Sequence, residues 1–147
     1  MNEEKKINLV ILDDDQEVHK LISDYFRNLN YNTIHFTNAL RAIDQAESEG
    51  SNWDVFLTDF HFTRLVASDF TQKMKKALPH LPVLLITHDS LTLSTEKEIT
   101  DGAFDLIFKP IRLLELHQSI NRAIELKKLK NDVVKLQNEV KYKSKKT

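Results

Sequence analysis

Three consecutive carboxylates, Asp13, Asp14 and Asp15, follow an apolar run near the start of the chain. Like charges at this spacing destabilise one another unless a cation compensates them or a carboxyl group stays protonated. Carboxylate oxygens are ligands that Mg²⁺ prefers, and Mg²⁺ needs only one or two of them beside water and phosphate oxygens. The triplet therefore indicates either a magnesium site or a solvated turn in which an Asp caps a helix.

Polar residues also end three later apolar runs: Asp59, Thr87 and Lys109. An Asp can act as a nucleophile toward a phosphoryl group and form an aspartyl phosphate. A hydroxyl and an ammonium group opposite a metal ion would stabilise the other phosphoryl oxygens. If the fold gathers these residues, they predict phosphoryl transfer onto Asp59.

The elements that must position these residues alternate along the chain. Four short apolar segments, and one segment in which polar and apolar residues alternate, predict five strands, and segments with helical spacing follow them. The predicted strands are residues 6–12, 31–37, 53–58, 82–87 and 104–108. This alternation predicts an α/β fold, with a parallel sheet and helices on both faces. Five strands favour a flavodoxin-like sheet of order 2-1-3-4-5, because the chain is too short for an eight-stranded barrel.

In such a sheet, ligands bind beyond the carboxyl ends of the strands. The first and third strands are then neighbours, roughly 4.8 Å apart, which places Asp59 beside Asp13 and Asp14. Lys109 lies two strands from Asp59, about 10 Å away, and its long side chain can reach back. With Thr87 on the strand between them, these residues are expected to form one site.

Helix ends are expected where capping residues stand. Asp15 and Asn38 are expected to cap the helices that follow them, and Gly102 is suited to end a helix at 93–101. A last helical pattern runs from residue 111 to about 140. A helix of that length, about 45 Å, would protrude from a body of this size.

Five pieces of the sequence, four short stretches and one helix, together resemble the receiver domain of two-component response regulators, the CheY-like family. The matching pieces are LVILDDD, DVFLTDF, PVLLIT and GAFDLIFKP with the helix after it, over about residues 7–125. The resemblance implies a signalling module, not an enzyme beyond its own phosphorylation and dephosphorylation. It also implies Mg²⁺ as cofactor and a histidine kinase or phosphotransfer protein as the phosphoryl donor.

The resemblance assigns a role to each matching residue. Asp13 and Asp14 match the metal-binding pair, and Asp59 matches the phosphoacceptor, which also binds the metal. His61 stands where a backbone carbonyl binds the metal, and its side chain stands where the dephosphorylation rate is tuned. Thr87 matches the hydroxyl group that moves onto the phosphate.

The match continues at Lys109, the phosphate-binding position, whose bond to Pro110 is usually cis in this family. The sequence departs from the family at His88, where a small residue is typical, and at Leu106, where Tyr or Phe often acts as a rotating switch. Asp89 occupies another position that tunes dephosphorylation. The loop FHFTRLVASDF lacks the Pro and Gly that the family usually carries there.

We expect two parts, a receiver domain at 1–125 and a helical extension at 126–147. Apolar residues with coiled-coil spacing mark the extension: Leu126, Leu129, Val133, Leu136 and Val140. They predict either a homodimer through a parallel two-stranded coil, or a solvated tail or linker, since two heptads are few.

Composition limits the function further. The formal net charge of −1 combines +6 at residues 127–147 with −7 in the rest of the chain. An acidic body argues against direct DNA binding, and the readout is expected to be protein–protein contact. The chain has no Cys and no apolar run of membrane-spanning length, so we expect a cytoplasmic protein without membrane insertion.

Two alternatives remain open. A degenerate receiver would act as an unphosphorylated scaffold or dimerisation module, which His88 and the altered loop motivate. A haloacid-dehalogenase-like phosphatase would use Asp13 and Asp15 as an early Asp-x-Asp pair. The chain lacks a suitable following Thr or Val for that chemistry, and it has no late acidic pair ahead of the predicted coil.

Overall fold

The computed structural model describes residues 5–59, 70–88 and 102–145, with side chains described up to residue 141. Its elements in chain order are β1 (Ile7–Leu12), α1 (Gln16–Phe26), β2 (Tyr31–Phe36), α2 (Ala39–Glu49), the 3-10 helix η1 (Gly50–Asn52), β3 (Val55–Asp59), α4 (Phe70–Ala77), β4 (Val83–Thr87), β5 (Asp105–Phe108) and α6 (Leu113–Lys145). The helix predicted at 93–101 lies outside the described residues, as do His61 and Asp89.

The five strands form one parallel sheet of order β2-β1-β3-β4-β5, which confirms the predicted topology. Strand β1 lies near the middle, where Leu9 pairs with Thr33 of β2 and with Val55 of β3. Because all strands run the same way, their carboxyl ends lie along one edge. Polar residues that follow different strands are thereby brought to that edge.

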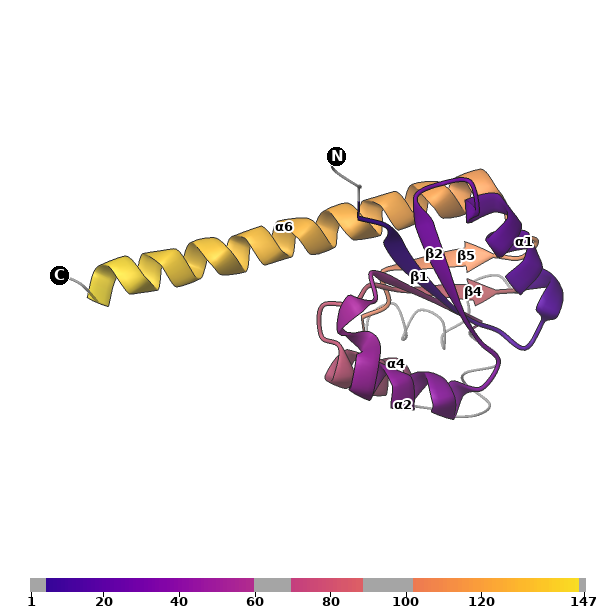
Figure 1. Cartoon of the computed structure of the whole chain (residues 1–147), viewed down its shortest axis with the longest axis horizontal. Coiled ribbons are helices and arrows are strands. Elements are labelled where there is room, and N and C mark those ends of the chain that lie inside the picture. Colours follow the sequence, from indigo (N-terminus) through magenta and orange to yellow (C-terminus); the bar gives the residue numbers. More distant parts are fainter. Residues whose placement is uncertain (1–4, 60–69, 89–101, 146–147) are drawn as a thin grey trace.

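Helices cover both faces of the sheet (Figure 1). Alternate residues of a strand point to opposite faces, so Leu9 and Ile11 join the core under α1 and α6. Val10 and Leu12 join the second core, under α2 and α4. These four β1 side chains are fully buried, which explains why the strand is a continuous apolar run.

Two predicted helix caps are present. The Asp15 carboxylate accepts a hydrogen bond from the backbone N–H of Glu17 at 2.9 Å, at the start of α1. The Asn38 side chain does the same for the N–H of Arg41 at the start of α2. Each bond satisfies a backbone donor that the first turn leaves without an intrahelical partner.

Helix α6 begins two residues later and ends five residues later than the sequence indicated, which makes it about 50 Å long. Leu116, Ile120 and Ala123 are fully buried against the sheet. Beyond them the helix projects away from the body (Figure 1). In the described parts of the chain, none of the helices, α6 included, combines the length and the apolar character that crossing a membrane requires.

Candidate functional site

The carboxyl ends of β1, β3 and β4 carry the predicted site residues. Asp13 directly follows β1, Asp59 is the last residue of β3, and Thr87 is the last residue of β4. In the sheet register Asp59 pairs with Ile86, one residue before Thr87. The three polar residues are therefore held by buried strand backbone, which fixes their positions relative to one another.

The Lys109 side chain connects two of these strand ends. Its Nζ lies 2.9 Å from Asp59 Oδ2 and 3.4 Å from Asp13 Oδ2. The Lys109 side chain is 12% exposed, and those of Asp59 and Asp13 are 7% and 0% exposed. Asp59 lies 46 positions after Asp13 in the sequence, and Lys109 lies 50 positions after Asp59. The fold brings them together as two carboxylates around one ammonium group.

Asp13 is the most deeply enclosed of the three. Its Oδ1 accepts a hydrogen bond from the backbone N–H of Asp15 at 2.8 Å. Its Oδ2 is buried and accepts no hydrogen bond from any residue that the structure describes. Burial raises the pKa of the Asp13 carboxyl group and the charge of Asp59 adds to this, although the Asp15 N–H and Lys109 act in the opposite direction.

Lys109 remains a cation in this environment. Burial alone would lower the pKa of its ammonium group, but the hydrogen bond and charge of Asp59, with the charge of Asp13, outweigh that effect. The pKa is therefore raised above its ordinary value of 10.5. The site thus holds a permanent positive charge that can interact with anionic oxygens at neutral pH.

Thr87 is held next to Lys109. It is buried at the end of β4, and its backbone carbonyl accepts a hydrogen bond from the Lys109 N–H at 2.8 Å. The peptide bond between Lys109 and Pro110 is cis.

The remaining predicted residues lie at the margin of this cluster or beyond it. Asp14 is exposed, and no residue in the described ranges forms a hydrogen bond or ion pair with its carboxylate. His88 is exposed, and Leu106 is half-buried against the core under α2 and α4. Asp15 serves as the α1 cap through its Oδ1, as expected from the sequence.

Sequence reasoning missed a histidine pair behind Asp13. His19 Nε2 lies 2.8 Å from the Asp13 carbonyl oxygen, and its Nδ1 lies 2.7 Å from Nδ1 of His35. Since a carbonyl only accepts, His19 donates to it from Nε2, and a neutral His19 then accepts at Nδ1 from His35. Burial lowers the pKa of His35, and the neighbouring His19 adds to this. The pair holds the backbone that carries the Asp13 carboxylate.

A divalent ion fits the donor set at this edge. Within the described residues, no three Asp, Glu or His side chains are grouped so that they could hold a metal ion alone. Mg²⁺ does not require such a group, because it binds through one or two carboxylates and keeps several waters. Asp13 Oδ2 is buried and accepts no hydrogen bond from the described residues, although Lys109 Nζ lies 3.4 Å from it. With the neighbouring Asp59 carboxylate it supplies the hard oxygen atoms that Mg²⁺ prefers.

Known proteins share this sequence pattern and fold. A family model described as the response regulator receiver domain matches residues 9–121. The putative response regulator NtrX-like protein of Rickettsia typhi is 26% identical over 92% of this chain and 28% of its own length. The heme response regulator HssR of Staphylococcus epidermidis is 26% identical over 75% of this chain and 48% of its own length. The chain thus spans less than half of either relative.

Solved structures agree on the fold. A response regulator receiver domain protein from Clostridium thermocellum superimposes with a TM-score of 0.76 at 23% identity, covering 84% of this chain and 98% of its own. The signal receiver domain of a putative LuxO repressor protein from Vibrio parahaemolyticus gives a TM-score of 0.76 at 20% identity. That match covers 87% of this chain and 97% of the other.

Proposed function

Because the chain belongs to the response regulator receiver domain family, whose members act in two-component phosphorelays, we propose that it is switched by phosphorylation of Asp59. The observation that carries this proposal is the contact of Lys109 with both Asp59 and Asp13 at the carboxyl edge of the sheet. Because Lys109 Nζ already lies 2.9 Å from an Asp59 oxygen, it is placed to contact an anionic oxygen of a group attached to that carboxylate.

In the proposed reaction, a carboxylate oxygen of Asp59 attacks the phosphorus atom of a phosphorylated imidazole on the donor protein. The new P–O bond forms as the P–N bond breaks, and the imidazole leaves with the electron pair of that bond. The Lys109 ammonium group then contacts a phosphoryl oxygen, and the Thr87 hydroxyl can donate to another. Asp13 and Asp59, with Asp14 and the His61 carbonyl by family resemblance, would hold Mg²⁺, which would supply positive charge against the phosphoryl oxygens.

A surface next to the site suits the donor protein. A pocket of about 350 Å³ lies between the start of α1 and residues 109–111, and it is lined in part by Lys109, Leu21 and Ile111. Leu21 is exposed and Ile111 is half-buried, so the pocket offers apolar surface beside Lys109. We propose that a sensor kinase or phosphotransfer protein docks there, in the cytoplasm.

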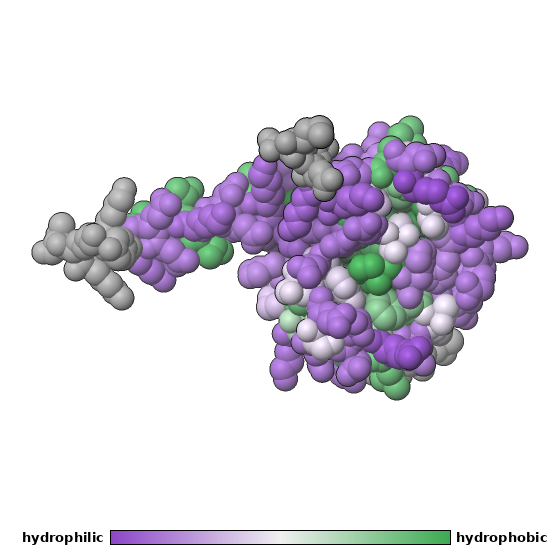
Figure 2. All heavy atoms as spheres, in the orientation of Figure 1, coloured by the Kyte–Doolittle hydropathy of each residue, from purple (hydrophilic) through white to green (hydrophobic). Residues whose placement is uncertain are grey.

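The projecting part of α6 supports a second element of the proposal, a homodimer. Its apolar residues lie at alternating spacings of three and four and are more than a third exposed: Leu126, Leu129, Val133, Leu136 and Val140. Figure 2 shows apolar patches on the otherwise hydrophilic projecting part of α6. In a coiled coil these residues would alternate between two kinds of core position. Val133 and Val140 occupy one kind and Leu129 and Leu136 the other, a combination that favours a parallel two-stranded coil. The output is then protein–protein contact, with no direct DNA binding.

Intact mass measurement after incubation with Mg²⁺ and acetyl phosphate tests the phosphorylation. The wild-type chain is expected to gain the mass of one phosphoryl group, and the Asp59→Asn variant is expected to gain none. Asp44→Asn, an exposed carboxylate on α2, serves as the matched control and should react like wild type. A wild-type chain without any adduct would support the scaffold alternative instead, in which receiver and helix act only as a dimerisation module.

A further inference from the structure

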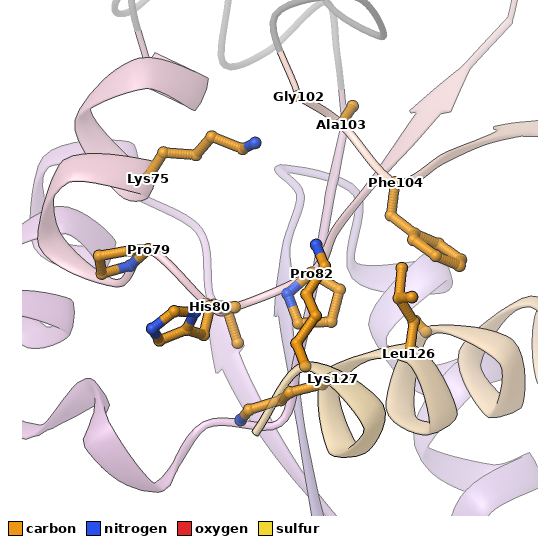
Figure 3. Close-up of a pocket in the computed structure, with 12 residues that line it drawn as sticks. Lys75, Pro79, His80, Pro82, Gly102, Ala103, Phe104, Leu126 and Lys127 are labelled. Atoms are coloured by element: carbon orange, nitrogen blue, oxygen red, sulfur yellow. The ribbon is translucent and has the colours of Figure 1, made fainter. Parts of the chain in front are cut away.

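A second pocket lies at the opposite edge of the sheet from Asp59. It has a volume of about 310 Å³ and is bounded by the end of α4, the segments that lead into β4 and β5, and the middle of α6. Figure 3 shows the side chains that line it. The phosphorylation chemistry proposed above makes no use of this pocket.

Basic side chains enter the pocket from separate elements: Lys75 from α4, His80 from the turn after it, and Lys127 and Lys130 from α6. No acidic residue is among the described residues that line it. Lys127 is already bound, because its Nζ donates to the Trp53 carbonyl at 2.9 Å and lies 3.7 Å from an Asp54 oxygen. Lys75 and Lys130 have no carboxylate partner within the part of the chain that the structure describes.

Lys75 is held inside the pocket and not spread over the surface. Its side chain is half-buried and extends from α4 toward Gly102 (Figure 3). A Cβ atom added at Gly102 would overlap Lys75 Nζ, and Gly102 has a φ of 124°, which side chains rarely tolerate. The glycine thus leaves the space that the ammonium group occupies.

The rest of the wall is apolar. Pro79, Pro82, Phe104 and Leu126 face the same space as the lysines (Figure 3). Leu126 is 38% exposed, and Phe104 is half-buried. Ligand sites typically combine such an apolar wall with a few converging charged groups.

We propose that this pocket binds a small organic phosphate monoester, with its phosphoryl group on Lys75 and Lys130 and its apolar part against Phe104 and Leu126. The phosphoryl group has three terminal oxygens and a charge of about −2, so it can accept hydrogen bonds from ammonium groups on two different elements. A carboxylate has only two oxygens and one charge for the same task. Binding would connect the end of α4 to the part of α6 from which the helix begins to project. A simpler account is that Lys75 interacts only with the carbonyl end of α4, and that account predicts no saturable binding.

Phenyl phosphate titrated into the ¹⁵N-labelled full chain, followed by ¹H–¹⁵N NMR, tests the proposal. The chain has only two glycines, so the Gly102 amide signal can be followed against that of Gly50. We expect saturable shifts of residues 102–104 and an unshifted Gly50. Inorganic phosphate should bind the same residues more weakly, because it lacks the apolar part.

Substitution identifies the groups that bind. Lys75→Gln and Lys130→Gln should each weaken phenyl phosphate binding about tenfold or more, as expected for loss of a charge-assisted hydrogen bond. Lys128→Gln, on the exposed side of α6, should leave the affinity unchanged, and thermal unfolding would confirm that all three variants fold. Unsaturable shifts, equal effects of all three substitutions, or shifts confined to the Asp13 and Asp59 edge would overturn the proposal.

The same titration on Asp59→Asn separates this pocket from the proposed phosphorylation. The variant should bind phenyl phosphate like wild type, since Asp59 lies at the other edge of the sheet. Conversely, Lys75→Gln should still accept a phosphoryl group on Asp59. Loss of phenyl phosphate binding in Asp59→Asn would contradict the proposed position of the ligand.

Discussion

At the scale of single residues, folding buries the Asp13 carboxyl group, and burial disfavours its charged form. Its pKa is raised above the ordinary 3.8 by burial, so the folded state holds a proton more tightly than the unfolded state. The stability linked to this group is fully present below pH 3.8 and is lost as the pH rises through the folded pKa. At neutral pH the ionised Asp13 therefore lowers the stability of the metal-free protein.

We accordingly expect Asp13→Asn to raise the free energy of unfolding at pH 7, by about 1 kcal/mol, the usual size of a stabilising single substitution. The gain should shrink toward pH 3, where wild-type Asp13 is itself neutral. Urea unfolding at both pH values, without Mg²⁺, measures this, and Asp44→Asn is the exposed control. A variant less stable than wild type at pH 7 would show that the Asp13 charge is fully compensated by its neighbours.

Lys109 compensates both buried carboxylates, and its removal should be costly. Lys109→Met leaves the charges of Asp13 and Asp59 in a buried site without a cation, and we expect a loss of roughly 3 kcal/mol at pH 7. The raised pKa of Lys109 means that its contribution is fully present below pH 10.5 and is lost as the pH rises through the folded value.

Denaturant unfolding between pH 7 and pH 11 checks this expectation. Wild type should lose stability above pH 10.5, and the difference between wild type and Lys109→Met should narrow over the same range. Lys128→Met provides the control for general loss of a lysine. An unchanged stability of Lys109→Met at pH 7 would mean that the two carboxylates find other compensation.

The sequence alone allowed the acidic residues, Thr87 and Lys109 to be placed at one edge, because parallel strands end on the same side. It did not predict that Lys109 contacts Asp13 as well as Asp59, since this depends on the path of a flexible side chain. His19 was also missed, although it lies three residues before the buried Ile22 and so on the same helix face. A buried polar residue on an apolar face could have signalled the network behind Asp13.

At the scale of elements, the cap of α1 positions the residues that follow β1. Replacing Asp15 with Ala removes the acceptor for the Glu17 N–H, and we expect a loss of about 1 kcal/mol of stability. Chemical denaturation measures it, with Asp14→Ala as the neighbouring control that makes no such bond. Equal stability of Asp15→Ala and wild type would show that water replaces the cap without cost.

All five strands were predictable: four are short, nearly continuous apolar runs, as buried parallel strands are, and β2 alternates polar and apolar residues. The boundaries were less predictable. Strand β3 begins at Val55 and not at Trp53. Trp53 directly follows η1, and its ring packs against the rings of Phe36 and Phe56. Helix α6 continues to Lys145, past Val140, the last aliphatic residue, because lysines are good helix formers and helical hydrogen bonds need no apolar face.

At the scale of the whole molecule, the projecting helix determines the predicted assembly. Leu129→Glu combined with Leu136→Glu places charges in the seam of the proposed coil and should convert the dimer to a monomer in sedimentation experiments. Asn131→Glu with Asn138→Glu adds the same charge on another side of the helix and should leave the dimer intact. A monomeric wild type, or a dimer unaffected by the seam substitutions, would reject the coil.

The central claim is that the fold gathers Asp13, Asp59 and Lys109 so that Asp59 accepts a phosphoryl group. Borohydride reduction after incubation with Mg²⁺ and acetyl phosphate, followed by peptide sequencing in a mass spectrometer, locates an aspartyl phosphate by converting that residue to homoserine. The account predicts homoserine at position 59 and at no other acidic position. Conversion at Asp13 or Asp14, or unmodified Asp59 under conditions in which a known receiver domain is phosphorylated, would contradict it.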